Sequence, residues 1–232
     1  MGTVLASTIM AAATGILQEE NTEAAERRWT DAWLFDGVNR GQREACFIKP
    51  DTYVLSGAVK LAAGTWQDLA AGELALLRIS HNMGTDGLTA GKLITKVDLD
   101  KILAWNPHFA AMDSSATVRH YAYDDRTPKQ FAVIPPQPAA SQGYVWMQRG
   151  GLAPDMVKPV GSYDVVINLG DEYANALTYY TVFWAYAKDS DFSPSARERA
   201  SAWYQVFAGL LGKKEQVEAE AVDRSAEQHE VG

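Results

Sequence analysis

Residues 27–50 read RRWTDAWLFDGVNRGQREACFIKP and contain the start, the packed face and the end of a long helix. Thr30 is a suitable N-cap, because its hydroxyl can accept a hydrogen bond from a backbone N–H of the first turn. Asp31 suits the positive end of the helix dipole, and Pro50 ends the segment because proline cannot continue a helix. The residues of one face are Leu34, Val38, Gly41, Ala45 and Ile48.

Two glycines in this helix indicate a close approach by another segment. Each glycine costs about 1 kcal/mol relative to alanine inside a helix. Gly37 and Gly41 are four residues apart and flank the packed face. We therefore expect another backbone to pack closely there, and assign Leu34, Gly37, Val38 and Gly41 to the packing surface of a helical bundle.

Further helices are predicted at both ends of the chain. In residues 3–18, apolar side chains recur at helical spacing. Residues 171–188 begin with two acids and end with a lysine, which suits the helix dipole. Residues 193–212 follow after a short connection, so the last two helices should form an antiparallel hairpin. The side chains expected to pack in this hairpin are Leu177, Trp184, Trp203 and Phe207.

The middle of the chain, residues 51–168, predicts a small antiparallel β domain. Short runs rich in aromatic and β-branched residues alternate there with turn residues. Two of them, TVRHYAY and KQFAVIP, should form a hairpin. Pro135, Pro136 and Pro138 are expected to end its second strand, because proline cannot donate to a β ladder.

The tip of this hairpin contains Asp124, Asp125 and Arg126. A catalytic carboxylate pair needs one pKa raised by burial or by the charge of its partner. Adjacent residues of a strand point to opposite faces, and a hairpin tip is solvated. Aspartates in turns instead accept hydrogen bonds from nearby backbone N–H groups. The sequence therefore favours turn formation over catalysis.

The overall composition is that of a soluble globular protein, with a formal net charge of −8 over 232 residues. This acidity argues against a protein that coats nucleic-acid phosphates, which needs clustered Lys and Arg. Cys46 is the only cysteine, and its apolar surroundings favour a small buried side chain over a reactive thiol. No segment approaches the roughly 18 apolar residues of a membrane span. We expect a soluble protein made inside the cell, without a membrane partner.

A search for catalytic motifs identifies none. Phosphate-binding loops, zinc-protease helices, CxxC pairs and GxSxG elbows do not occur. His81 and His120 lie on predicted strands and could converge, but two isolated histidines are more often structural than metal ligands. Asp98 is better interpreted as a helix cap than as a calcium ligand. The aromatic residues of the last two helices could form a sugar or base platform, but their helical spacing favours packing. We predict no enzyme and no catalytic, cofactor or metal residues.

Residues 213–232 are acidic and poor in apolar side chains. Such a segment cannot bury enough surface to fold by itself, so it should be a disordered tail or an arm ordered by a partner. Basic side chains that could contact phosphates lie before and within its start, although interspersed glutamates weaken that interpretation. They are Arg197, Arg199, Lys213 and Lys214.

The order of these motifs resembles that of the head-to-tail adaptor proteins of short-tailed bacteriophages, the tail-tubular-A-like neck proteins. The segment RWTDAWLFDGVNRGQREACFIKPD is similar to the family's helix that runs into Lys-Pro-Asp. The segment LLRISHNMG, the proline-containing hairpin and the helix DEYANALTYYTVFWAYAKD follow in the family's order. One departure is Gly37-Val38-Asn39, where the family often has Leu-Asn. The likeness covers nearly the whole chain.

The resemblance implies a homo-oligomeric ring of about twelve copies below the portal protein, held by cyclic contacts. It further implies that the C-terminal helices and tail bind the portal, that the β domain faces the tail nozzle protein, and that double-stranded DNA passes without sequence-specific binding. The implied location is the virion neck, after synthesis in the host cytoplasm. Two alternatives remain: another capsid or tail accessory protein of the virion, or a carbohydrate-active enzyme with a pocket in the β domain.

The predicted fold class is α+β: a bundle of N- and C-terminal helices, a central antiparallel β domain and an extended C-terminal arm. The predicted divisions are a helix pair at 1–50, the β domain at 51–168, a helical hairpin at 169–212 and an acidic polar tail at 213–232.

Overall fold

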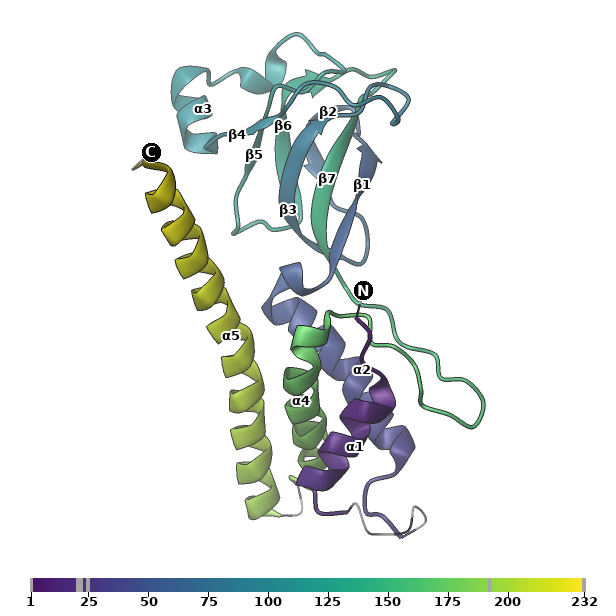
Figure 1. The fold of residues 1–232 in the computed structure, drawn as a ribbon. Helices are drawn as coiled ribbons and strands as arrows, with labels where there is room; N and C mark the ends of the chain where they lie inside the picture. Colours follow the sequence, from purple (N-terminus) through teal and green to yellow (C-terminus); the bar gives the residue numbers. More distant parts are fainter. Residues whose placement is uncertain (1, 20–22, 24–25, 192, 231–232) are drawn as a thin grey trace. The chain divides into compact units, whose positions relative to one another are not determined.

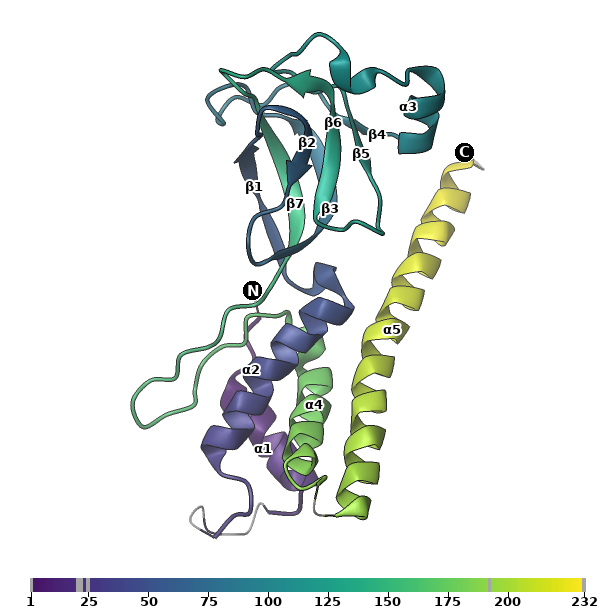
Figure 2. The same ribbon diagram turned by 180° about the vertical axis from the view of Figure 1, so that it is seen from behind.

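The computed structural model describes residues 2–19, 23, 26–191 and 193–230, with the backbone alone beyond Gly212 (Figures 1 and 2). The chain forms two compact units. Residues 1–49 and 153–232 make a helical unit, and residues 50–152 make a β unit. The α+β fold with a central antiparallel sheet domain is confirmed.

The helical unit contains α1 (Ala6–Ile16), α2 (Asp31–Ile48), α4 (Ala174–Ala187) and α5 (Pro194–Glu230), with a short 3-10 helix, η3 (Asp171–Tyr173), before α4. Thr30 caps α2 as predicted: its hydroxyl accepts a hydrogen bond from the Trp33 N–H at 3.3 Å. Cys46 is buried in the same helix, as predicted. Helix α2 therefore begins where the sequence indicates, and Leu34, Val38, Gly41 and Ala45 of its predicted face are buried. Ile48, the last residue of the helix, is exposed instead, so the packed face ends before it.

The two glycines of α2 lie against α4. A Cβ added at Gly37 would lie 3.0 Å from Trp184 Cδ1, and one at Gly41 would lie 3.0 Å from Tyr180 Cδ1. The close approach is therefore present, but side chains of α4, rather than its backbone, fill the space that the glycines leave. Leu34, Val38 and Leu177 are buried in the same unit.

An aromatic cluster joins α4 to α5. Tyr180 meets Phe207 at a ring-centroid distance of 5.0 Å, and Phe183 meets Tyr204 at 5.2 Å, both edge to face. The Tyr204 hydroxyl donates a hydrogen bond to Glu44 of α2 at 2.7 Å. Trp203, which is half-buried, stacks on Tyr179 at 5.4 Å. The two helices thus form the predicted antiparallel hairpin.

Helix α5 is longer than predicted, because it continues past Gly212 to Glu230. Residues after Gly212 are mostly Glu, Ala, Lys and Gln, which favour helix strongly enough to offset one glycine. The two alternatives given for this segment, a disordered tail or an arm ordered by a partner, did not take this propensity into account. The side chains of Lys213 and Lys214 lie outside the described part of the chain.

The segment 153–168 belongs to the helical unit, and not to the β domain as the sequence suggested. Buried amides of α2 hold it there: Asn39 Oδ1 accepts from the Met156 N–H at 2.8 Å, and Gln42 Oε1 accepts from the Asn168 N–H at 2.7 Å. Near its end, Val166 pairs with Leu5 in an isolated antiparallel bridge. These bonds satisfy backbone groups that would otherwise require a β-sheet partner.

The β unit consists of two sheets. One has the order β1-β7-β3, and the other has the order β2-β6-β5-β4. All strand pairs are antiparallel except β4 with β5. The strands are β1 (Val54–Lys60), β2 (Gly64–Asp68), β3 (Glu73–Asn82), β4 (Thr95–Lys96), β5 (His120–Tyr123), β6 (Gln130–Gln137) and β7 (Tyr144–Gly151), preceded by the 3-10 turn η1 (Pro50–Thr52). A shared core includes Leu76, Ile79, Phe131, Val133, Val145 and Met147.

A second, smaller core covers one side of the β5–β6 pair. Helix α3 (Leu99–Trp105) and the 3-10 turn η2 (Phe109–Ala111) supply it, and Phe109 is buried with Ala132 and Ile134. Asp98 caps α3 by accepting a hydrogen bond from the Asp100 N–H at 2.9 Å, as predicted.

Strand β6 does not end at its prolines, as the sequence had suggested; it includes Pro135 and Pro136. Its pairing with β5 ends at Ile134, and its register with β2 shifts from Ala132 to Gln137. Both prolines therefore fall where neither neighbouring strand has a paired residue, so no ladder bond requires their missing N–H. The Pro136 carbonyl instead accepts from the Ser115 N–H at 2.9 Å.

Candidate functional site

The hairpin tip between β5 and β6 has the contacts of a turn. Asp124 Oδ1 accepts hydrogen bonds from the Arg126 backbone N–H at 2.9 Å and from Arg126 Nε at 3.1 Å. The Asp124 carbonyl accepts from the Thr127 N–H at 2.9 Å. The Arg126 side chain, followed by its backbone N–H, lowers the pKa of Asp124 below its ordinary value. A half-buried aspartate whose pKa is lowered in this way is a poor proton donor, and its hydrogen bonds are those of a turn.

The two strand histidines do not meet. His120 Nδ1 lies 2.8 Å from Thr95 Oγ1 at the β4–β5 pair. His81, on β3 of the other sheet, stacks on Trp146 with a centroid distance of 6.2 Å. Within the described residues, no group of three or more His, Cys, Asp or Glu side chains could hold a metal ion.

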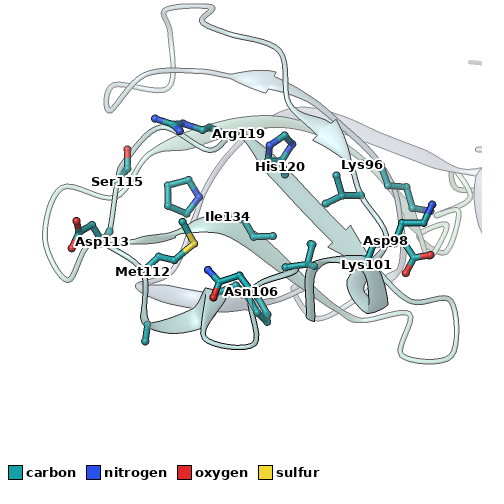
Figure 3. Close-up of a pocket in the computed structure, with 16 residues that line it drawn as sticks. Lys96, Asp98, Lys101, Asn106, Met112, Asp113, Ser115, Arg119, His120 and Ile134 are labelled. Atoms are coloured by element: carbon teal, nitrogen blue, oxygen red, sulfur yellow. The ribbon is translucent and has the colours of Figure 1, made fainter. Parts of the chain in front are cut away.

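A cavity of about 1130 Å³ opens between the α3–η2 segment and the β5–β6 pair (Figure 3). Ile134 and Phe109 contribute apolar surface, while Lys96, Lys101 and Arg119 contribute positive charge. Its two acids do not converge: Asp98 and Asp113 lie at opposite ends of the cavity (Figure 3). Asp98 also uses its carboxylate to cap α3. The convergent acid pair that a glycoside hydrolase requires is therefore not formed by these lining residues.

The basic residues of α5 are separated along the helix. Arg197 and Arg199 lie in its first turns, where Arg197 donates to the Ser190 carbonyl at 3.2 Å and Arg199 lies 5.7 Å from the Tyr186 ring centroid. The backbone of Lys213, whose side chain is not described, lies about 24 Å beyond Arg197 along the helix, at the usual rise of about 1.5 Å per residue. Arg197 and Arg199 therefore lie near the start of α5, while Lys213 and Lys214 belong to a later part of its backbone.

An aromatic pair with cationic neighbours lies on the surface of α2 and α4. Trp33 and Trp184 stack with their ring centroids 5.0 Å apart. The guanidinium carbon of Arg40 lies 4.4 Å from the Trp184 ring centroid, and Lys188 Nζ lies 5.1 Å from the Trp33 ring centroid. Sequence reasoning assigned Trp184 to helix packing and did not identify Arg40 and Lys188 as cationic neighbours of the two tryptophans. One signal was available, because Arg40 lies seven residues, about two helical turns, after Trp33 on α2.

A second feature missed by sequence reasoning is the exposed turn of residues 157–161 in the helical unit. It contains Val157, Lys158 and Val160, all exposed. The Val-Lys-Pro-Val-Gly run indicates a turn, but nothing in it indicates on which unit the turn is carried.

None of the helices in the described part of the chain combines the length and apolar composition of a membrane span. No curated protein matches the sequence significantly. A family model described as SU10 adaptor protein matches residues 5–229, nearly the whole chain. The family consists of phage head-to-tail adaptors, which are structural proteins, so the resemblance predicted from the order of motifs is confirmed. The chain belongs to the SU10 adaptor protein family of bacteriophage head-to-tail adaptors.

Proposed function

We propose that this adaptor forms a ring of about twelve copies in the virion neck, between the portal protein and the tail nozzle protein. The observation that carries the proposal is the family match over residues 5–229, which includes both units and almost all of α5. A head-to-tail adaptor must contact components on two sides, and a chain with two separate compact units is suited to that task.

In this proposal α5 provides the contact with the portal. Its final part, after Gly212, is a helix with few apolar residues. Such a helix is only marginally stable alone and gains order from a partner. Arg197, Arg199, Lys213 and Lys214 are the proposed polar contacts. Loops of the β unit would meet the nozzle.

The charge of the chain supports a passive role toward DNA. With a formal net charge of −8 per copy, a ring of this protein would repel DNA phosphates and not retain them. Double-stranded DNA would therefore slide through the ring without sequence-specific binding.

Deletion of residues 213–232 tests the portal contact. The buried side chains that attach α5 to the bundle, including Phe207 and Leu211, remain in the truncated chain. We expect the helical unit to stay folded, as judged by circular dichroism, while binding to purified portal protein is lost or weakened at least about tenfold. Unchanged affinity would remove the proposed role of this segment.

A further inference from the structure

Residues 153–168 form a loop that is fixed at both ends and projects from the helical unit. At its ends, Asn39 holds Met156 and Gln42 holds Asn168, through hydrogen bonds of 2.8 and 2.7 Å from backbone N–H groups. Between these points the loop extends away from α1 and α2 in both views (Figures 1 and 2). The bundle thus carries a lateral projection.

The apex of the loop, residues 157–161, displays apolar side chains and includes a turn at residues 160–161. Val157 is 86% exposed and Val160 is fully exposed. Lys158 lies 4.3 Å from the ring centroid of Tyr163, which in turn packs on Phe35 of α2 at 5.3 Å. The Ser162 N–H donates to the Pro159 carbonyl at 3.3 Å, so two exposed valines flank or lie in a turn with internal contacts. Such contacts limit the conformational freedom that would be lost on binding, which makes the apex a candidate interaction site.

A complementary surface lies on the other side of the same unit. Helix α5 is separated from the loop by the other helices of the unit (Figures 1 and 2). Its inner face is buried through Ala196, Ala200, Phe207 and Leu211. Its outer face, which is exposed, includes Glu198, Ala202, Gln205, Val206 and Gly209, with the exposed Arg199 at its edge. This face pairs an acid with an apolar side chain, Val206, that is 42% exposed.

We propose that the apex of one copy packs against the outer face of α5 in the next copy. Val157 and Val160 would contact Val206, and Lys158 would pair with Glu198. The two surfaces lie on opposite sides of one protomer, so the contact is heterologous, and repetition of such a contact closes into a ring. This inference rests on the proposed ring and specifies its subunit interface.

Cysteine cross-linking in phage particles tests this contact directly. The full-length double variant Val160→Cys with Val206→Cys carries one cysteine on each surface, while Cys46 is buried and should not react. A short bismaleimide should link successive copies into a ladder of covalent oligomers. Each single variant should remain monomeric. Val160→Cys with Ser201→Cys is the matched control, because residue 201 is exposed and lies about 140° around α5 from Val206 at the usual 3.6 residues per turn.

Charge reversal in the same cross-linking experiment tests the proposed ion pair separately from the apolar contact. In the cross-linking background, Lys158→Glu and Glu198→Lys should each reduce the ladder by up to about fivefold, the upper end of what one surface ion pair contributes. The combined reversal should restore it. A merely structural effect on folding would not be rescued by the second change.

The outcomes separate this contact from the proposed function. If particles contain one copy per portal subunit but no ladder forms, the interface is wrong and the ring stands. Products that stop at dimers would indicate a two-fold contact and would also overturn the inference. If the protein is absent from the neck of the particle, the proposed function fails and this interface fails with it.

Discussion

Gly41 shows how a single residue sets the distance between two helices. An added Cβ would lie 3.0 and 3.2 Å from two atoms of the Tyr180 ring, which is held by Phe183 and Phe207. Overpacking of this kind costs about 1–3 kcal/mol, more than the about 1 kcal/mol that alanine gains in a helix. We expect Gly41→Ala to lower the free energy of unfolding, measured by urea denaturation of the helical signal.

Gly209 is the matched control for this prediction. It lies in α5, and an added Cβ would meet nothing within 4 Å. Gly209→Ala should therefore raise the free energy of unfolding by about 1 kcal/mol through helix propensity alone. Equal effects of the two substitutions would contradict the packing described for Gly41.

Asp124 is predicted to stabilise its hairpin through its position in the turn. Asp124→Ala removes the acceptor for the Arg126 N–H and Nε groups, so the β unit should become less stable. Asp124→Asn keeps an acceptor for the backbone N–H and should lose less. Thermal unfolding of the three proteins measures this order, with Asp125→Ala as the neighbouring control. A larger effect at Asp125 would contradict the assignment.

At the scale of elements, one carboxylate attaches the N-terminal segment to the start of α4. Asp171 accepts hydrogen bonds from the Val4 N–H at 2.9 Å, the Thr3 N–H at 2.5 Å and the Thr3 hydroxyl at 2.7 Å. These bonds, the Val4 N–H first, lower the pKa of Asp171 below its ordinary value of 3.8. The carboxylate therefore stabilises the fold above pH 3.8, and this contribution is lost as the pH falls through the lowered pKa.

Asp171→Asn should consequently destabilise the helical unit at neutral pH and have little effect once wild-type Asp171 is protonated. Hydrogen exchange of the α1 amides at pH 7, followed by thermal unfolding down to pH 3, measures both effects. Asp191→Asn is the control, since Asp191 is exposed in the α4–α5 connection. A constant difference between wild type and Asp171→Asn at every pH would contradict this tether.

The elements that sequence reasoning located are those with local signals. Thr30 and Pro50 bracket α2, and Asp98 caps α3, because caps and stops act within a few residues. Residues 153–168 are held by the side-chain amides of Asn39 and Gln42 in α2, more than a hundred positions away in the sequence. The periodicity of apolar residues does not indicate such long-range hydrogen bonds. Pro135 and Pro136 were wrongly predicted to end β6. A strand can contain a proline at a position where the neighbouring strands do not pair, and the sequence does not show where those positions are.

The candidate surfaces were less predictable than the fold. The packing of Leu177 and Phe207 follows from helical spacing, and both are buried. The exposure of Val157 and Val160 does not follow from the spacing of apolar residues. The segment was predicted to belong to the β domain, where valines usually pack in the core. Contacts with portal or nozzle depend on partners that a single sequence does not contain.

At the scale of the whole molecule, the chain has two compact units, and the proposed function assigns a different contact to each. The helical unit carries α5 and the projecting loop, and the β unit carries turns such as the one at Asp124. A ring requires only that one lateral contact repeat with closed symmetry. Its copy number should then be that of the portal on which it assembles.

The most direct test of this account is quantitative mass spectrometry of purified phage particles that carry this protein. Its copies are counted against the portal protein and the major capsid protein in the same sample. We predict a one-to-one ratio with the portal, at about twelve copies per particle. Hundreds of copies would instead indicate a capsid component, and absence from the particle would contradict a structural role in the neck.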